Sequence, residues 1–213
     1  MMISPLCLRR TMRHTDAGGD DNMEDTPESA GHVPAGSLRP GAFVQAVAAK
    51  VYRHFERLAG GPDHVANHAP CGTSSQAPQA QPAVWWPLHV HIRHRLAKFW
   101  FGPDGTVHYE LWLHERTARL ELGLHFESGP QRNLALYHEF DKCLLEIQMR
   151  LGNSIWLEEW DRGWTRLYET LPMWPVDESR AESIAARLCE IIEVLQPIYV
   201  AISERLEHAG RPG

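Results

Sequence analysis

The 213-residue sequence contains no long apolar run and no closely spaced pair of cysteines, and we expect no secretory leader. No segment approaches the ~20 consecutive apolar residues that a membrane-spanning helix needs. The first residues, MMISPLCLRRTMRH, contain no apolar core of a signal peptide. The four cysteines are scattered without a Cys-x-x-Cys pair, which favours reduced thiols over a disulfide framework. We therefore expect a cytoplasmic protein that makes no membrane contact.

Motifs that carry well-defined chemistry are missing as well. The sequence has no nucleophile elbow, no His-Glu-x-x-His, no Gly-x-Gly-x-x-Gly and no phosphate-binding glycine-rich loop. Its formal charge of −6 disfavours nucleic acid as a partner, without removing it as an alternative. We expect no cofactor and no metal, and we favour a non-catalytic protein while leaving enzymatic activity open.

Composition divides the chain into four parts. Residues 1–40 are rich in Gly, Asp, Ser, Thr and Pro, which predicts a disordered tail. Residues 41–60 carry apolar side chains at three- and four-residue spacing, which predicts an amphipathic helix. Residues 61–84, rich in Ala, Pro, Gln and Ser, are typical of a flexible linker. All eight tryptophans lie beyond this linker, so we expect the folded domain over residues 85–209.

Strict two-residue alternation begins at Leu88 and predicts β-strands. We interpret the run 88–101 (LHVHIRHRLAKFWF) as one strand that ends at the turn Gly-Pro-Asp-Gly. Two further alternating runs, 106–114 and 118–127, are joined by a short turn. Together the three runs predict an antiparallel meander with one aliphatic face.

Two more helices and a hairpin complete the predicted domain. Apolar stripes at helical spacing cover residues 134–151 and 179–208, the second interrupted by Pro197. Between them, residues 154–169 predict a hairpin with Asp-Arg-Gly as its loop. The order is thus α–linker–βββ–α–ββ–α, an α+β fold in which helices pack on one face of an antiparallel sheet.

The opposite face of the sheet is the candidate functional surface, because it mixes His, Arg and Trp. With the Gly-Pro-Asp-Gly turn as register marker, Phe101 opposes Thr106. The same register puts three pairs side by side, namely Phe99 with His108, Arg95 with Trp112, and Arg93 with His114. The second hairpin adds two tryptophans and an arginine. The predicted binding surface comprises His89, His91, Arg93, Arg95, Trp112, His114, Trp160, Trp164 and Arg166.

Three other functions of this face are alternatives to a protein–protein interface: metal binding, nucleic-acid binding and catalysis. A metal could bind His89-x-His91, whose imidazoles lie ~6.5–7 Å apart on a strand, but Arg93 places a cation beside them. Aromatic and arginine side chains could stack the bases of single-stranded nucleic acid. Four further residues could support acid–base catalysis as a carboxylate–imidazole cluster in the middle of the sheet: Glu110, Glu121, His108 and His125.

We favour a protein surface, because Trp, Tyr, Arg and His anchor interfaces and exposed apolar patches mark partners. The partner would be another protein or a second copy of the chain, as in a homodimer. Alternatively, the helix over residues 41–60 would dock on this face and bury its tryptophans.

About half of the chain, residues 98–202, resembles an uncharacterised bacterial domain of unknown function. The resemblance lies in YELWLHERTARLELGLHFE, LYHEFDKCLLEIQMRLG, WLEEWDRGWTRLYETLP and the closing helix. That domain forms the C-terminal part of some restriction-endonuclease-like proteins, whose nuclease chemistry resides in the other half. The resemblance therefore implies an accessory role near DNA processing or defence, and no catalytic residue.

Overall fold

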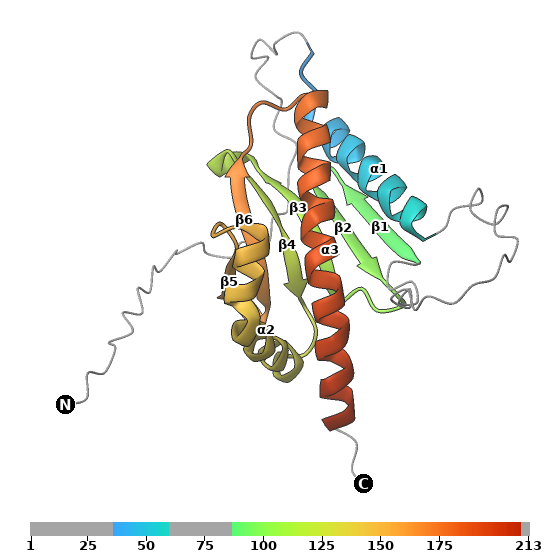
Figure 1. Cartoon of the computed structure of the whole chain (residues 1–213). Helices are drawn as coiled ribbons and strands as arrows, with labels where there is room; N and C mark the ends of the chain where they lie inside the picture. The colour runs from blue at the N-terminus through green and yellow to red at the C-terminus, as the bar shows by residue number, and fades with distance from the viewer. Residues whose placement is uncertain (1–35, 60–86, 210–213) are drawn as a thin grey trace, which may run out of the picture. The chain divides into compact units, whose positions relative to one another are not determined.

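The computed structural model describes residues 36–59 and 87–209, an α+β fold with an antiparallel sheet (Figure 1). The predicted linker lies entirely outside the described residues, and so does the predicted tail apart from residues 36–40. The elements are α1 (Pro40–Leu58), β1 (Leu88–Arg93), β2 (Leu96–Phe101), β3 (Val107–His114), a 3-10 turn η1 (Glu115–Thr117), β4 (Arg119–Phe126), α2 (Pro130–Leu151), β5 (Trp156–Glu159), a second 3-10 turn η2 (Asp161–Gly163), β6 (Thr165–Pro172) and α3 (Glu178–Ala209).

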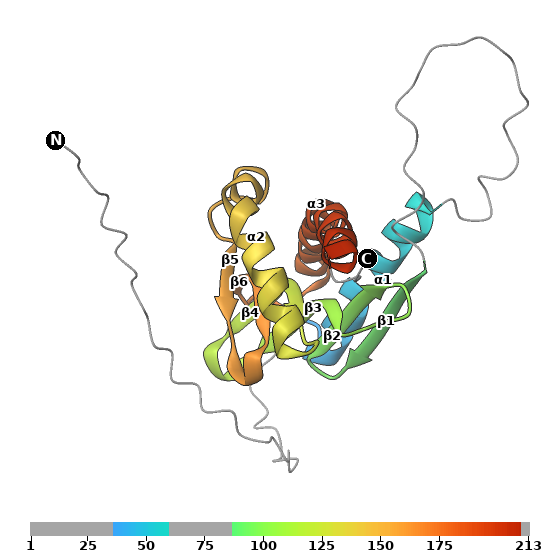
Figure 2. The same ribbon diagram turned by 90° about the horizontal axis from the view of Figure 1, so that it is seen from below.

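The six strands form one sheet in the order β1-β2-β3-β4-β6-β5, with every neighbouring pair antiparallel. Figure 2 shows α2 and α3 on the same side of this sheet. Leucine and phenylalanine side chains of β3 and β4 meet the apolar stripes of the helices there and are fully buried. The aliphatic face therefore supplies the hydrophobic core. None of the described helices is long and apolar enough to cross a membrane.

The helix near the N-terminal end of the described chain, α1, packs into this same core. Phe43, Val47, Val51 and Phe55 on its inner face are completely buried. The ring of Phe55 meets that of Phe101 edge-on, with centroids 5.6 Å apart. The alternative in which this helix covers the His/Arg/Trp face is therefore wrong.

The run interpreted as one strand is a hairpin. β1 and β2 pair with each other, and His94 and Arg95 form the turn between them. The meander consequently has four strands and the sheet six. Neither turn residue is a Gly, Pro, Asn or Asp, so composition gives no turn signal here. Tertiary contacts stabilise the turn instead. The carbonyl of Arg95 accepts a hydrogen bond from the Leu113 amide, and His94 packs against Gly41.

The predicted register between β2 and β3 is wrong by one residue. Phe99 pairs with Tyr109 rather than with His108. The loop is longer than assumed, because the amide and hydroxyl of Thr106 both bond to the Asp104 carboxylate at 2.9 Å instead of joining the ladder. Since side chains alternate across a sheet, a one-residue offset moves each of them to the other face.

The predicted neighbours change accordingly. Arg95 lies in the turn rather than beside Trp112, and Arg93 pairs with Leu96 rather than lying beside His114. Lys98, which the predicted register assigned to the aliphatic side, pairs with Glu110 and reaches the helix-free face.

Gly123 in the middle of β4 is required by the close approach of β6. A Cβ at this position would lie 2.6 Å from the Leu167 carbonyl oxygen and 2.6 Å from the Tyr168 Cβ. We predict that Gly123→Ala lowers the free energy of unfolding by about 1–3 kcal/mol, the range for overpacking, as measured by urea denaturation. Gly129→Ala is the matched control, because nothing lies within 4 Å of its Cβ. Equal stability of the two variants would contradict this account.

Candidate functional site on the helix-free face

The helix-free face is organised around the pairing of β3 with β4. In this register His108 lies opposite His125, Glu110 opposite Gly123, and Trp112 opposite Glu121. Paired residues share a face of the sheet, so the polar side chains of both strands converge on the side away from the helices. The carboxylates and imidazoles expected to cluster here do come together.

These side chains form an alternating carboxylate–imidazole row. His108 Nε2 lies 3.0 Å from Glu110, His125 Nε2 lies 3.7 Å from Glu110 and 3.2 Å from Glu121, and His114 Nε2 lies 3.4 Å from Glu121. The four central side chains are at most 3% exposed: His108, Glu110, Glu121 and His125. Such burial of ionisable groups is tolerated only where they are paired.

Lys98 closes one end of the row. Its ammonium nitrogen lies 3.0 Å from His108 Nε2, 3.0 Å from Glu110 Oε1 and 3.1 Å from Glu127 Oε2. His108 Nδ1 lies 2.8 Å from the Gly105 carbonyl oxygen, a distance at which it can donate a hydrogen bond. The ammonium is thus placed between two carboxylates and an imidazole.

Arg166 closes the other end. Its Nη1 donates to both carboxylate oxygens of Glu121 at 3.0 Å, and Nε and Nη2 donate to Glu158 at 3.1 and 2.8 Å. The guanidinium also lies between two rings, 4.5 Å from the Trp160 centroid and 4.0 Å from that of Tyr168. Ion pairs in the plane and aromatic rings beside it fix this side chain in one position.

Neighbouring side chains keep the buried carboxylates ionised. Burial alone would raise the pKa of Glu110, but His125, His108 and Lys98 outweigh it and lower that pKa to about 2. Burial likewise opposes ionisation of Glu121, but His114, His125 and Arg166 hold its pKa well below the usual range. Both carboxylates are therefore ionised at neutral pH.

The predicted site residues fall into two groups. The first, here called the tryptophan–arginine platform, lies over β3, β4 and β6, and its rings are in contact: Trp112–His114, Trp112–Trp160 and Trp160–Trp164 have centroids 4.0, 6.2 and 6.1 Å apart. The platform comprises Trp112, His114, Trp160, Trp164 and Arg166.

The second group lies on β1 and its turn. His89 stacks on Trp100 with centroids 5.3 Å apart, Arg93 Nε donates to His91 Nε2 at 3.3 Å, and Arg95 pairs with Glu115 at 2.6 Å. Strand β2 separates this group from the platform.

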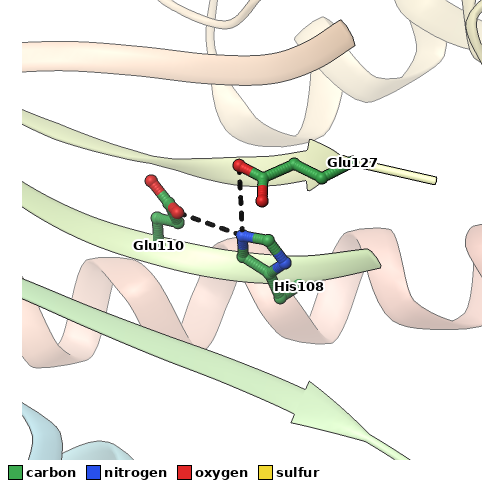
Figure 3. Close-up of side chains that lie close together, drawn as sticks. All are labelled: His108, Glu110 and Glu127. Atoms are coloured by element: carbon green, nitrogen blue, oxygen red, sulfur yellow. Dashed lines mark hydrogen bonds and ion pairs between the residues drawn. The ribbon is translucent and has the colours of Figure 1, made fainter. Parts of the chain in front are cut away.

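The metal-type geometry in the described residues is not at His89-x-His91. It is formed by His108, Glu110 and Glu127, whose ligand atoms lie within 4.8 Å of one another. Figure 3 shows the His108 Nε2 directed at both carboxylates. These are ligand types that Zn²⁺ accepts, but the Lys98 ammonium already contacts all three side chains. A metal ion would have to displace it.

Sequence reasoning missed Lys98 and gave Tyr168 no role. Lys98 was lost through the one-residue register error. The sequence feature that could have revealed it is the pair Asp104 and Thr106. Their hydrogen bonds keep Thr106 in the loop, and the resulting register places Lys98 on the polar face. Tyr168 follows Arg166 at two-residue spacing in β6, so alternation alone places it on the same face.

Comparison of the chain with protein-family models, with curated proteins and with solved structures finds no match. The resemblance to a restriction-endonuclease-associated domain therefore stays a prediction. Arguments about function depend on the geometry of the helix-free face.

Acid should weaken the fold through the two buried carboxylates. Their folded-state pKa values lie below the unfolded value of ~4.3, so their contribution is full above that pH and is lost as the pH falls toward 2. We expect Glu121→Gln to cost about 3 kcal/mol at pH 7, because it breaks a buried pair, and to flatten the loss of stability below pH 4.5. Unfolding free energies from pH 3 to 7 measure this. Glu207→Gln, at an exposed position, should leave the profile unchanged.

Lys98→Ala should create a zinc site from the three groups that the ammonium now contacts. We expect calorimetry at pH 7 to show Zn²⁺ binding at least about tenfold tighter than in the wild type, a difference of ~1.4 kcal/mol or more. His108→Ala in the same background should abolish the gain. Equal affinity in wild type and Lys98→Ala would show that the ammonium does not exclude the metal.

Proposed function

We propose that the chain is a non-catalytic binding module that contacts a protein partner through the tryptophan–arginine platform. The observation that carries the proposal is the fixed Arg166 guanidinium between Trp160 and Tyr168, with Trp112 and Trp164 beside it. Trp, Tyr and Arg are the residue types that dominate binding energy at protein interfaces, above all where they are held rigidly.

The charged row supports binding rather than catalysis. Glu110 and Glu121 are occupied by Lys98, Arg166 and the histidines, and burial closes them to a substrate. Two hollows of the described residues lie between α1 and α3 and between α2 and α3, away from this face. A catalytic acid or base must reach the reacting atom at hydrogen-bond distance, and the side chains of Glu110 and Glu121 are only 3% exposed.

The free-energy cost of burying the carboxylate–imidazole row is itself an argument that this surface has a function. A buried ionic network is often no more stable than apolar side chains of similar volume. A sheet face with only a structural role would need none of these charges. We infer that the network holds the platform rings in the positions that a partner requires, in a protein of the cytoplasm. The accessory role near DNA processing or defence that the resemblance implies would suit such a module.

Photo-crosslinking tests the proposal in the living cell. Benzoylphenylalanine at Trp156, which is 62% exposed beside Tyr168, should give one discrete protein adduct that disappears with Trp160→Ala. The control position is Leu145 on α2, which is 73% exposed and should give no such adduct. An adduct of twice the chain's mass would identify a second copy as the partner. No adduct at position 156, or the same adduct at both positions, would reject the proposal.

A further inference from the structure

Strand β5 lies at one edge of the sheet, and no described strand pairs with its outer side (Figure 1). The Trp160 amide, directly after β5, donates to the Trp164 carbonyl at 2.6 Å. In an antiparallel ladder, residues that bond to the neighbouring strand alternate with residues whose N–H and C=O groups point away from it. The register of β5 with β6 continues this bond, so Leu157 and Glu159 direct their backbone groups outward. Such an edge can accept one more strand.

The side chains along this edge are aromatic and acidic. Trp156, Glu158 and Trp160 alternate on the helix-free face, and Trp156 is 62% exposed. Glu159 is exposed on the edge itself, and the Asp161 side chain in η2 is 68% exposed. An added strand would therefore meet both tryptophan rings and carboxylates.

The basic side chains nearby do not cancel these acids. Arg166 is only 13% exposed and is already bonded to both Glu121 and Glu158. Arg162 is exposed, and its Nε lies 3.9 Å from an oxygen of Asp161. Together β5 and η2 contain three acids and this one arginine, so the edge presents a net negative charge.

We propose that the partner adds an extended, arginine- or lysine-rich segment to the free edge of β5. The inference rests on the proposed function, because it names the chemistry of the protein that meets the tryptophan–arginine platform. Charge complementarity selects a basic segment, and the outward backbone groups of Leu157 and Glu159 select an extended one.

An arginine suits the helix-free side of this edge better than other side chains. Residues that oppose each other across a ladder share a face of the sheet. Alternate residues of the added strand would therefore lie beside Trp156, Glu158 and Trp160. A guanidinium there can pair with a carboxylate and stack on an indole ring at the same time.

A second copy of the chain offers less of this chemistry. The other edge strand of the sheet, β1, contains one arginine, no lysine and two histidines. One permanent positive charge would then face three acids. A separate basic segment therefore complements the edge of β5 better than β1 of a second copy does.

Amide spectra of the full ¹⁵N-labelled chain test the inference, with a synthetic peptide of alternating arginine and threonine as the probe. The largest shifts should fall on Leu157, Glu159 and their neighbours in β5. With arginines on the helix-free face, the threonine N–H groups face β5, so replacing each threonine by proline should weaken binding at least about tenfold. A peptide of alternating glutamate and threonine should not bind. No shifts in β5, or equal affinity for the proline peptide, would overturn the proposal.

Variants of the chain separate the backbone contact from the charge. Glu159→Pro removes an outward N–H and should weaken binding of the arginine–threonine peptide at least about tenfold. Glu159→Gln removes the charge alone and should weaken it roughly two- to fivefold. Ile92→Pro makes the matched change on β1, at a residue that is 40% exposed, and should leave the affinity unchanged. Equal losses in the two proline variants would place the peptide elsewhere.

Two comparisons keep the outcomes distinct. The proline peptide tests the same contact on the unaltered chain, so a folding defect in Glu159→Pro cannot decide the result. A crosslinked adduct in the cell without peptide binding at β5 would reject the added strand and leave the platform as the partner surface. Peptide binding at β5 without an adduct would reject the cellular partner alone.

Sedimentation of the chain without peptide tests the remaining occupant. We expect no self-association that depends on the two edge strands. Self-association that both Glu159→Pro and Ile92→Pro abolish would assign the edge of β5 to β1 of a second copy, and would overturn the separate basic partner.

Discussion

The bidentate ion pair between Glu121 and Arg166 is the interaction on which the helix-free face depends. It joins β4 to β6 across the middle of the sheet and satisfies a carboxylate that is 3% exposed. Because its guanidinium is fixed by two carboxylates, Arg166 can hold Trp160 and Tyr168 on its two sides. Without Arg166, the buried Glu121 carboxylate would lose its arginine partner and the two rings would lose their common support.

The two faces of the sheet bury their side chains in different ways. On the helix-covered face, apolar packing dominates and one charged pair is admitted, Glu169 with Arg187 of α3. That arginine also donates to the Leu151 carbonyl at 2.6 Å, so a single side chain ties α3 to β6 and to the end of α2. On the other face no described helix excludes water, and the side chains cover one another. Lys98 and Arg166 close the two ends of the row, and the aromatic rings lie over it.

Periodicity was sufficient to predict the fold class, because it reports which face of an element is apolar. It placed the helices and most strands of this chain on the correct segments. Periodicity failed at His94–Arg95. The turn there depends on two contacts distant in sequence, one between Arg95 and Leu113 of β3 and one between His94 and Gly41 of α1. It failed again at Thr106, since one side chain–backbone hydrogen bond decides whether that residue belongs to the loop or to the ladder.

The same reasoning explains which part of the candidate site could be predicted. His108, Glu110, Glu121 and His125 all lie on β3 and β4, whose register follows from their own alternation. Lys98 comes from a strand whose register depends on the loop, so the key cation of the row was missed. Site residues within one hairpin are thus predictable from local patterns, whereas residues contributed across a loop of uncertain length are not.

Net charge is a poor guide to what this surface binds, because charges of opposite sign occupy different places. Acidic side chains outnumber basic ones on α3, the two kinds are equal in number on α2, and the row on the sheet is internally paired. A total of −6 averages over three surfaces with different electrostatic character. Over distances beyond about 10 Å at 0.1 M salt these surfaces hardly sense one another, so each must be judged by its own residues. The total of −6 therefore does not describe the helix-free face, where Lys98 and Arg166 lie among paired carboxylates.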